Sequence, residues 1–214
     1  MSAPGEHLTF PSGDLTLEGL FHRPAAVPHP AVVVCHPHPL FGGDMHNTVL
    51  AAVCEALVDA GIAAMRFNFR GVGRSAGRFG DFVGERADAM AALAYLRQME
   101  GVDTAKVGIV GYSFGAAVAL AAADDDVAAL AAVSPPDFAH AMSPPTIRCP
   151  ALLITGDRDD VAPPGLLSSL AGKIGPHCRV EVVPGADHFW WGYEGKLAPA
   201  VAGFLRDSLL TPGR

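Results

Sequence analysis

The sequence is poor in charge and in long apolar runs. Only 17% of the 214 residues are charged, and the formal net charge is −7. Lys and Arg form no cluster of the kind that binds a phosphate backbone, so we expect no nucleic-acid partner. No stretch approaches the roughly 18 consecutive apolar residues that a membrane-spanning helix needs, so we expect no membrane partner either.

Cysteines are few, and no secretory signal is recognisable. The cysteines at positions 35, 54, 149 and 178 form no C-x-x-C pair. The first residues contain no basic segment followed by an apolar one. Together these features predict buried thiols in a protein of the reducing cytoplasm, with two disulfide bridges as the alternative.

Hydrophobic residues, by contrast, make up half of the chain. No linker, internal repeat or low-complexity block divides it. We therefore expect residues 1–214 to form one globular domain around one sizeable core. The composition leaves the oligomeric state open.

Short apolar runs alternate with longer helical patterns after an N-terminal hairpin. The hairpin is expected over His7–Phe10 and Leu15–Leu20. Further strands are expected at Ala31–Cys35, Ala63–Phe69, Lys106–Gly111, Val127–Val133, Ala151–Thr155 and Arg179–Val183. Helices are expected at Thr48–Ala60, Glu85–Met99, Phe114–Ala123, Leu166–Ile174 and Leu197–Leu210.

Continuous apolar strands followed by helices predict an α/β fold with a parallel sheet covered on both faces. Ligands of such sheets bind beyond the carboxyl ends of the strands. We therefore expect the functional residues in the loops that follow Cys35, Phe69, Gly111, Thr155 and Val183.

A G-x-S-x-G motif, G-Y-S-F-G at 111–115, lies in one of these loops. A sharp turn from strand to helix holds its central Ser113 in a strained conformation, and small flanking residues let the turn close. The helix N-terminus and the N–H of Phe114 then face any negative charge that develops beside Ser113. Ser113 is thus the candidate nucleophile, although the motif alone also fits an ordinary tight turn.

A serine hydroxyl needs an imidazole base and a carboxylate that orients it. In folds with this turn, the acid and then the histidine follow the serine along the chain. His188 follows a strand end, whereas His177 precedes a strand and His140 comes too early. The loop after Thr155 offers Asp157, Asp159 and Asp160 as candidate acids.

The loop after Cys35 reads H-P-H-P-L-F-G-G over residues 36–43. Its two histidines, with Asp44 and His46 nearby, are a weak candidate for a metal site, because no Cys or carboxylate cluster accompanies them. We expect no metal and no cofactor. The better interpretation is a loop that lends a second backbone N–H to the site beside Ser113, with His36 or His38 as base only a minor alternative.

With this loop, residues 66–75 (R-F-N-F-R-G-V-G-R-S), G-Y-S-F-G and G-A-D-H at 185–188, the chain resembles small bacterial α/β-hydrolases related to dienelactone hydrolase. The resemblance extends from Ala31 to Phe189. It implies a mostly parallel, twisted sheet of about seven or eight strands flanked by helices, with an N-terminal antiparallel hairpin.

The same resemblance assigns site residues. The family pattern G-x-x-D-x-x-x-P selects Asp159 as the acid, with Asp160 next. It implies the backbone N–H of His38 as the second oxyanion donor, with Leu40 as runner-up. Dienelactone hydrolase itself has Cys where this chain has Ser113, so its particular activity is not expected here.

Only residues 134–150 separate two of the expected strands, and they contain four prolines. This length leaves little or no room for a lid, so we expect an open cleft. Aromatic and apolar residues are expected to line it, each with ordinary packing as the alternative: Leu40, Phe41, Tyr112, Phe138, Phe189 and Trp190.

The resulting expectation is a serine hydrolase that cleaves small-molecule carboxylic esters through an acyl-enzyme. An acyltransferase, a thioesterase or a peptidase would use the same three residues. A non-catalytic interaction protein that retains the fold is the alternative outside enzymology.

Overall fold

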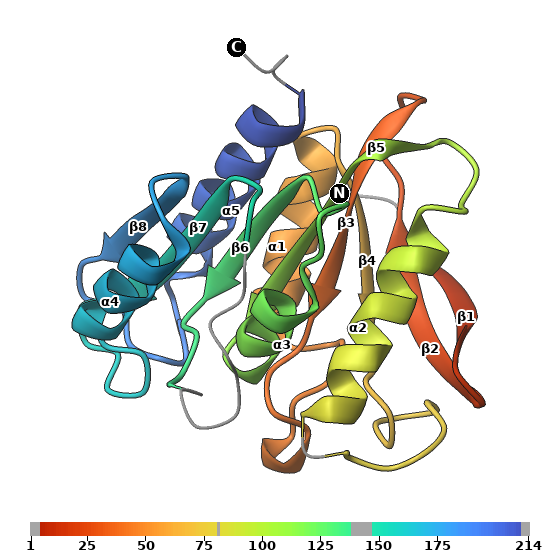
Figure 1. The fold of residues 1–214 in the computed structure, drawn as a ribbon, viewed down its shortest axis with the longest axis horizontal. Coiled ribbons are helices and arrows are strands. Elements are labelled where there is room, and N and C mark those ends of the chain that lie inside the picture. The colour runs from red at the N-terminus through yellow and green to blue at the C-terminus, as the bar shows by residue number, and fades with distance from the viewer. Residues whose placement is uncertain (1–4, 81, 138–146, 211–214) are drawn as a thin grey trace.

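The computed structural model describes residues 5–80, 82–137 and 147–210. Its centre is an eight-stranded sheet (Figure 1). The strands are β1 (Glu6–Ser12), β2 (Leu15–His22), β3 (His29–Cys35), β4 (Ala63–Phe67), β5 (Val102–Tyr112), β6 (Ala129–Val133), β7 (Ala151–Gly156) and β8 (Cys178–Val183). The order across the sheet is β1-β2-β4-β3-β5-β6-β7-β8.

The strand directions agree with the sequence-based expectation. β1 and β2 form an antiparallel hairpin, and β2 joins β4 in antiparallel register. The strands β3 to β8 all run parallel, with β3 and β5 side by side at the centre. The expected α/β fold, with its N-terminal hairpin and mostly parallel sheet, is confirmed.

Helices cover both faces of this sheet (Figure 1). They are the short 3₁₀ helix η1 (Pro39–Phe41) and the α-helices α1 (Thr48–Asp59), α2 (Val83–Leu96), α3 (Phe114–Ala122), α4 (Pro164–Ile174) and α5 (Glu194–Leu210). One apolar layer joins the sheet to α2, α3 and α4. The other joins it to α1 and α5. The inner strands β6 and β7 are buried along their whole length, so their sequences are continuously apolar, whereas the edge strand β8 carries Arg179 and Glu181 and is only partly buried.

Several element boundaries differ from the expected ones, and at two of them the backbone N–H groups donate to acceptors outside the regular hydrogen-bond pattern. β4 ends at Phe67 rather than Phe69. The N–H of Asn68 donates to the carbonyl of Glu18, and the N–H of Phe69 donates to Nε2 of His36. α2 begins at Val83, before Glu85, whose carboxylate accepts from the backbone N–H groups at 80 and 82.

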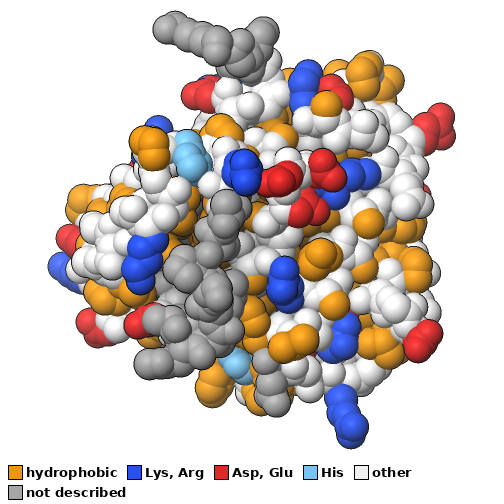
Figure 2. Space-filling model, viewed as in Figure 1, with side chains coloured by type: hydrophobic (Ala, Val, Ile, Leu, Met, Phe, Trp, Pro, Cys, Tyr) orange, Lys and Arg blue, Asp and Glu red, His pale blue; other side chains and the backbone are white. Residues whose placement is uncertain are grey.

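All four cysteines are free; those at positions 35, 54 and 149 are buried as expected, whereas Cys178 is only half-buried. Within the described ranges, no helix combines the length and the hydrophobicity that crossing a bilayer requires. On the face drawn in Figure 2, the Lys and Arg side chains lie apart from one another, between acidic and apolar groups.

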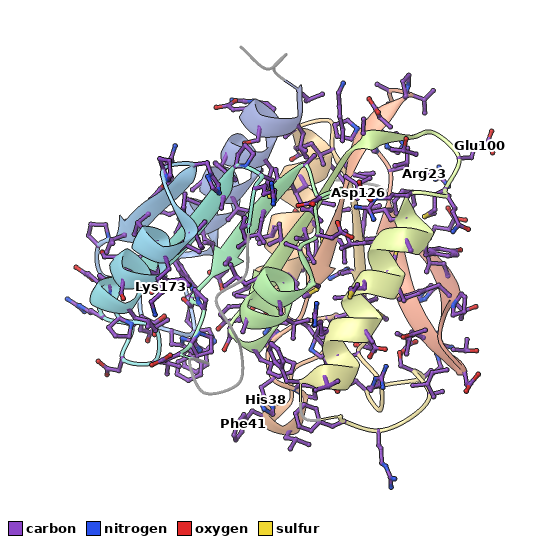
Figure 3. All side chains as sticks on the ribbon, viewed as in Figure 1. Arg23, His38, Phe41, Glu100, Asp126 and Lys173 are labelled. Carbon is purple, nitrogen blue, oxygen red and sulfur yellow. The ribbon has the colours of Figure 1, made fainter. Side chains whose placement is uncertain are left out.

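The segment between β6 and β7 is short. Its described parts, 134–137 and 147–150, contain no helix and no strand. The parallel strands all end at the lower edge of the sheet in Figure 1. His38 and Phe41 lie at that same edge (Figure 3), beyond the end of β3.

Candidate active site

Ser113 lies in a turn of strained backbone between β5 and α3. Its φ and ψ angles are 54° and −119°, which non-glycine residues rarely adopt. A Cβ on Gly111 would lie 2.0 Å from the carbonyl oxygen of Gly115, and one on Gly115 would lie 2.3 Å from that of Cys35. The two glycines of the motif are therefore required for the turn to close.

The side chain of Ser113 meets His188, which follows β8. Ser113 Oγ lies 2.9 Å from His188 Nε2, and His188 Nδ1 lies 3.0 Å from both carboxylate oxygens of Asp159. An ionised carboxylate can only accept, so Nδ1 carries the proton in this arrangement. Nε2 is then left with a lone pair for the hydroxyl proton of Ser113.

Asp159 is 2% exposed, and donors surround its carboxylate. Oδ1 accepts from the backbone N–H groups of Val161 and Ala162, at 2.9 and 2.7 Å. Burial raises the pKa of this carboxyl, but hydrogen bonds from His188, Ala162 and Ser134 outweigh it and lower the pKa to about 2. Asp159 is therefore ionised at neutral pH.

The neighbouring aspartates, Asp157 and Asp160, differ from Asp159 in position and contacts. Asp160 is exposed. Asp157 accepts from the backbone N–H of Gly185 at 2.7 Å, which ties the loop of the acid to the loop of the histidine. At Gly156 the two loops approach so closely that a Cβ would lie 2.0 Å from the carbonyl oxygen of Ala186.

Tyr112 ties the histidine loop to the strand that carries Ser113. Its hydroxyl donates to the carbonyl of His188 at 2.7 Å. Burial raises the pKa of this phenol, so it stays protonated and keeps donating. The other two candidate histidines lie elsewhere: His177 Nε2 contacts the carbonyl of Ile147, and His140 lies outside the described residues.

His36 holds the loop after β3 as a neutral, buried group. Its Nδ1 lies 2.6 Å from the carbonyl of Pro37, and its Nε2 accepts from the N–H of Phe69. Burial lowers the pKa of His36 to about 4. With both nitrogens used, His36 is a structural residue and not a base.

His38 lines the cleft beside Ser113, and its ring packs among phenylalanine side chains. Its Nδ1 accepts from the N–H of Leu40 at 3.2 Å, and its ring packs against Phe41, Phe79 and Phe114. Within the described chain, the N–H of His38 donates to no protein acceptor, whereas the N–H of Leu40 is already used. This difference favours His38 over Leu40 as an oxyanion donor.

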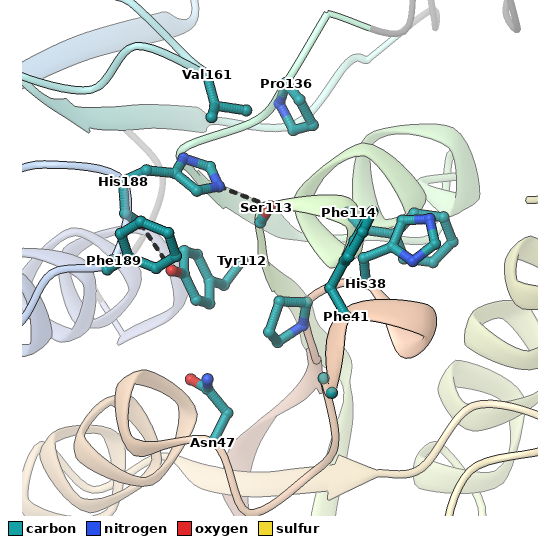
Figure 4. Close-up of a pocket in the computed structure, with 13 residues that line it drawn as sticks. His38, Phe41, Asn47, Tyr112, Ser113, Phe114, Pro136, Val161, His188 and Phe189 are labelled. Atoms are coloured by element: carbon teal, nitrogen blue, oxygen red, sulfur yellow. Dashed lines mark hydrogen bonds between the residues drawn. The ribbon is translucent and has the colours of Figure 1, made fainter.

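Ser113 lines a cleft of about 520 Å³, whose lining side chains are drawn in Figure 4. Its lining residues are Pro37, His38, Phe41, Gly42, Gly43, Asn47, Tyr112, Ser113, Phe114, Pro136, Val161, His188 and Phe189. Phe41, Tyr112 and Phe189 thus lie where the sequence analysis expected them. Phe138 lies outside the described residues.

Two expected lining residues are absent from this cleft. Leu40 is 69% exposed, because its place in η1 turns its side chain to solvent. Trp190 is fully buried in the layer with α1 and α5. Its φ of 61° turns the ring inward, and its Nε1–H donates to Ser134 at 3.0 Å. Placing both in the cleft was wrong.

The sequence analysis missed Asn47, Pro136 and Val161 as lining residues. Asn47 caps α1, where its Oδ1 accepts from the N–H of Val49. An Asn that precedes a helical pattern indicates such a cap, but the cap does not reveal that it faces a cleft.

Among the described residues, no group of three or more His, Cys, Asp and Glu side chains could hold a metal ion.

The fold and the arrangement of Ser113, His188 and Asp159 define an α/β-hydrolase. The sequence model of the dienelactone hydrolase family matches residues 17–196. The chain therefore belongs to the dienelactone hydrolase family. An uncharacterized protein of Rickettsia prowazekii is 32% identical over 203 residues, which cover 88% of this chain and 84% of that protein.

Two solved structures of α/β serine hydrolases are similar to this chain over nearly its whole length. An α/β serine hydrolase homologue from Coxiella burnetii has 32% identity and a TM-score of 0.85, over 95% of this chain and 98% of that chain. An α/β serine hydrolase without a lid from Xanthomonas campestris has 31% identity and a TM-score of 0.83, over 100% and 99% of the chains. The family and these structures support a hydrolase function.

Proposed function

We propose that this protein hydrolyses small carboxylic esters through an acyl-enzyme on Ser113. The observation that carries the proposal is the continuous hydrogen-bonded series from Ser113 Oγ to His188 and on to Asp159, at 2.9 and 3.0 Å. The series ends on a strained serine at the floor of an apolar cleft. A serine–histidine hydrogen bond that only stabilised the fold would require neither a strained serine backbone nor an adjacent cleft.

In the first half-reaction, Ser113 Oγ attacks the acyl carbon while its proton passes to His188 Nε2. The tetrahedral intermediate collapses when the carbon–alkoxy bond breaks, and His188 returns that proton to the leaving alcohol. In the second half, water attacks the acyl carbon, and its proton takes the same route through His188 to Ser113 as the carboxylic acid leaves. Asp159 stabilises the imidazolium and remains ionised throughout.

The oxyanion of each tetrahedral intermediate is proposed to lie between the backbone N–H groups of Phe114 and His38. Phe114 is the first residue of α3, where backbone donors and the helix dipole favour negative charge. The absence of a protein acceptor for the N–H of His38, among the described residues, supports the second position.

The cleft supports a small substrate with an apolar acyl or alcohol group. Phe41 and Phe189 border it and are 87% and 54% exposed. Such surfaces favour apolar groups by about 25 cal/mol for each Å² that leaves water.

Hydrolysis of p-nitrophenyl acetate by the wild type and by Ser113→Ala tests this function. We expect the variant to fall to the uncatalysed rate while its melting temperature and circular dichroism stay unchanged. A Ser113→Ala rate equal to that of the wild type would overturn the proposal. Thioester, amide and alcohol-acceptor substrates, compared on the same enzyme, separate an esterase from a thioesterase, a peptidase or an acyltransferase.

A further inference from the structure

The side chains that line the cleft beside Ser113 carry no fixed charge. The described lining residues include no Asp, Glu, Lys or Arg. Of their two histidines, His38 is neutral at neutral pH because burial lowers its pKa, and His188 keeps a lone pair on Nε2 for Ser113. Residues 138–146, outside the described ranges, contain no Lys or Arg either. A carboxylate that entered the cleft would therefore find no cationic partner among the described lining residues.

The charged residues next to these lining residues along the chain are all acidic. They are Asp44, Asp137, Asp160 and Asp187. The salt bridges of the described residues include none of Asp44, Asp160 and Asp187. Burial raises the pKa of the Tyr112 phenol, and the charges of Asp159 and Asp187 raise it further, so both carboxylates act on a group that lines the cleft. A negatively charged ligand would therefore be repelled as well as unpaired.

Arginines of the neighbouring loops do not reverse this balance. The guanidinium of Arg66 donates to a backbone carbonyl in the loop before α1, and that of Arg70 is ion-paired with the buried Asp88. Arg158, in the loop of the acid, is exposed to water. None of these three arginines lines the cleft.

The position of His188 determines where the two halves of an ester lie. In the proposed mechanism, the proton on His188 passes to the leaving alcohol, so the alcohol lies on the His188 side of Ser113. Val161 and Pro136 are on that side in Figure 4, and Asn47 is on the opposite side. The acyl group is thus directed toward Asn47 and the start of α1.

The N-terminus of α1 does not make this part of the cleft attractive to an anion. A helix N-terminus is equivalent to about half a positive charge. The carboxylate of Asp44 brings a full negative charge to the same turn, because the N–H of Asn47 donates to the carbonyl of Asp44. Asn47 Oδ1 also accepts from the N–H of Val49, so that donor is already used. The chain's own groups therefore cap and neutralise the start of α1.

We propose that the cleft selects esters whose acyl group carries no negative charge, so that neutral acyl esters are good substrates and half-esters of dicarboxylic acids are poor ones. A charge that leaves water without a partner is costly, whereas a neutral group of the same size is not. The surrounding carboxylates add repulsion to that cost. This inference rests on the proposed function of Ser113, Asp159 and His188.

Charge variants at the cleft should move this selectivity in both directions, measured as the ratio of kcat/KM for a neutral acyl ester to that for its anionic counterpart. Asn47→Asp keeps a residue type that caps α1 but adds a negative charge, so the ratio should rise about threefold. Phe41→Arg brings a cation to the exposed rim and should lower the ratio about fivefold. Val27→Arg is the matched control, because Val27 is 70% exposed and precedes β3, whereas the cleft follows it. Equal ratios in Phe41→Arg and Val27→Arg, or a wild-type ratio in Asn47→Asp, would overturn the inference.

Two p-nitrophenyl esters with the same acyl chain give the ratio: the adipamate, which ends in an amide, and the adipate half-ester, which ends in a carboxylate. For the wild type we expect kcat/KM to be at least about tenfold higher for the adipamate. The ratio should narrow as NaCl rises from about 10 mM to about 500 mM, because salt screens exposed carboxylates.

The Ser113→Ala variant keeps this test separate from the proposed function. Hydrolysis of the adipamate ester by the wild type but not by Ser113→Ala would support the proposed nucleophile, whatever the ratio is. Equal kcat/KM for the two esters, or a ratio that salt does not change, would then overturn the charge selectivity alone.

Discussion

The two sides of the cleft are built differently. On the acid–base side, residues 156–163 and 184–193, loops from β7 and β8 approach at van der Waals limits, and Asp159 and Trp190 are buried. On the oxyanion side, residues 36–43, the chain forms a short helix whose apolar side chains are exposed, with Phe41 at 87%. Proton transfer requires that the donor and acceptor atoms are held in place, whereas binding of a small apolar group requires exposed apolar side chains that it can contact. The comparison predicts that changes at the buried residues of the acid–base side act on kcat and stability, and that changes at the exposed residues of the oxyanion rim act on KM.

The largest expected effect follows from Asp159→Asn. The amide keeps the shape of the carboxylate, but its N–H₂ would face His188 Nδ1 and favour the tautomer that carries its proton on Nε2. That tautomer cannot accept the Ser113 proton, so kcat should fall about 10⁴-fold. The measurement is kcat for p-nitrophenyl acetate, with Asp160→Asn as the control. A loss of less than tenfold, or an equal loss in the exposed Asp160→Asn, would assign the acid elsewhere.

Gly156→Ala tests how tightly the acid–base side is closed. Its Cβ would lie 2.0 Å from the carbonyl oxygen of Ala186, so the two loops must separate. We expect the free energy of unfolding to fall by about 3 kcal/mol and kcat to fall with it. At Gly42, on the oxyanion side, a Cβ would meet no neighbouring atom, and only the positive φ of 79° disfavours alanine. We therefore expect Gly42→Ala to lower the free energy of unfolding by about 1 kcal/mol. Urea unfolding measures the stability of both variants. Equal losses of stability in Gly156→Ala and Gly42→Ala would show that the two sides of the cleft are not packed differently.

The buried His36 predicts a pH-dependent stability on the inner part of the oxyanion side. Its pKa is lowered from 6.5 to about 4 in the folded state, mainly by burial. Between these values the unfolded chain binds more protons, so the free energy of unfolding falls as the pH drops from about 6.5 to 4 and levels off below. The full contribution is about 3 kcal/mol.

Urea unfolding of the wild type and of His36→Gln at pH 7 and at pH 4 measures that contribution. Gln offers an acceptor to the N–H of Phe69 but does not titrate. The wild type should lose more stability than His36→Gln over this range. Parallel losses in the two proteins would show that His36 is not the buried neutral group described above.

The smallest effects are expected at the rim. Phe41→Ala should change the free energy of unfolding by less than about 0.5 kcal/mol, because the side chain is exposed. KM for esters with longer acyl chains should rise about threefold as apolar contact is lost, with kcat unchanged. Leu40→Ala is the matched control, because Leu40 is also exposed but does not line the cleft. Equal changes in KM in both variants would contradict the placement of the rim.

Much of the fold is predictable from the sequence, because a sheet buried on both faces requires continuous apolar strands. The order of β3 to β8 along the chain and the loop after each strand follow from that pattern. The ends of β4 and α2 are not predictable from periodicity, because His36, Glu18 and Glu85 redirect backbone hydrogen bonds there. His36 and Glu18 are distant from β4 along the chain, and Glu85 accepts from the backbone of the irregular loop that precedes α2.

The candidate site divides in the same way. Ser113 and His188 could be predicted, because a motif and the position after a strand end determine where they lie. The burial of Trp190 could not be predicted. Its ring lies in the core because its φ is positive, and nothing in the sequence Trp190-Trp191 indicates which of the two residues adopts that conformation. The exposure of Leu40 depends on the conformation of η1, and the cleft-facing side of Asn47 depends on how α1 meets the sheet.

Covalent labelling by a fluorophosphonate tests the central claim most directly, because the reagent requires an activated serine and no knowledge of the natural substrate. Intact-mass and peptide analysis should show one adduct, on Ser113, in the wild type. The adduct should be absent in Ser113→Ala and should form far more slowly in His188→Ala. No adduct on the wild type, or an adduct that persists in Ser113→Ala, would contradict the assignment of Ser113 as the nucleophile.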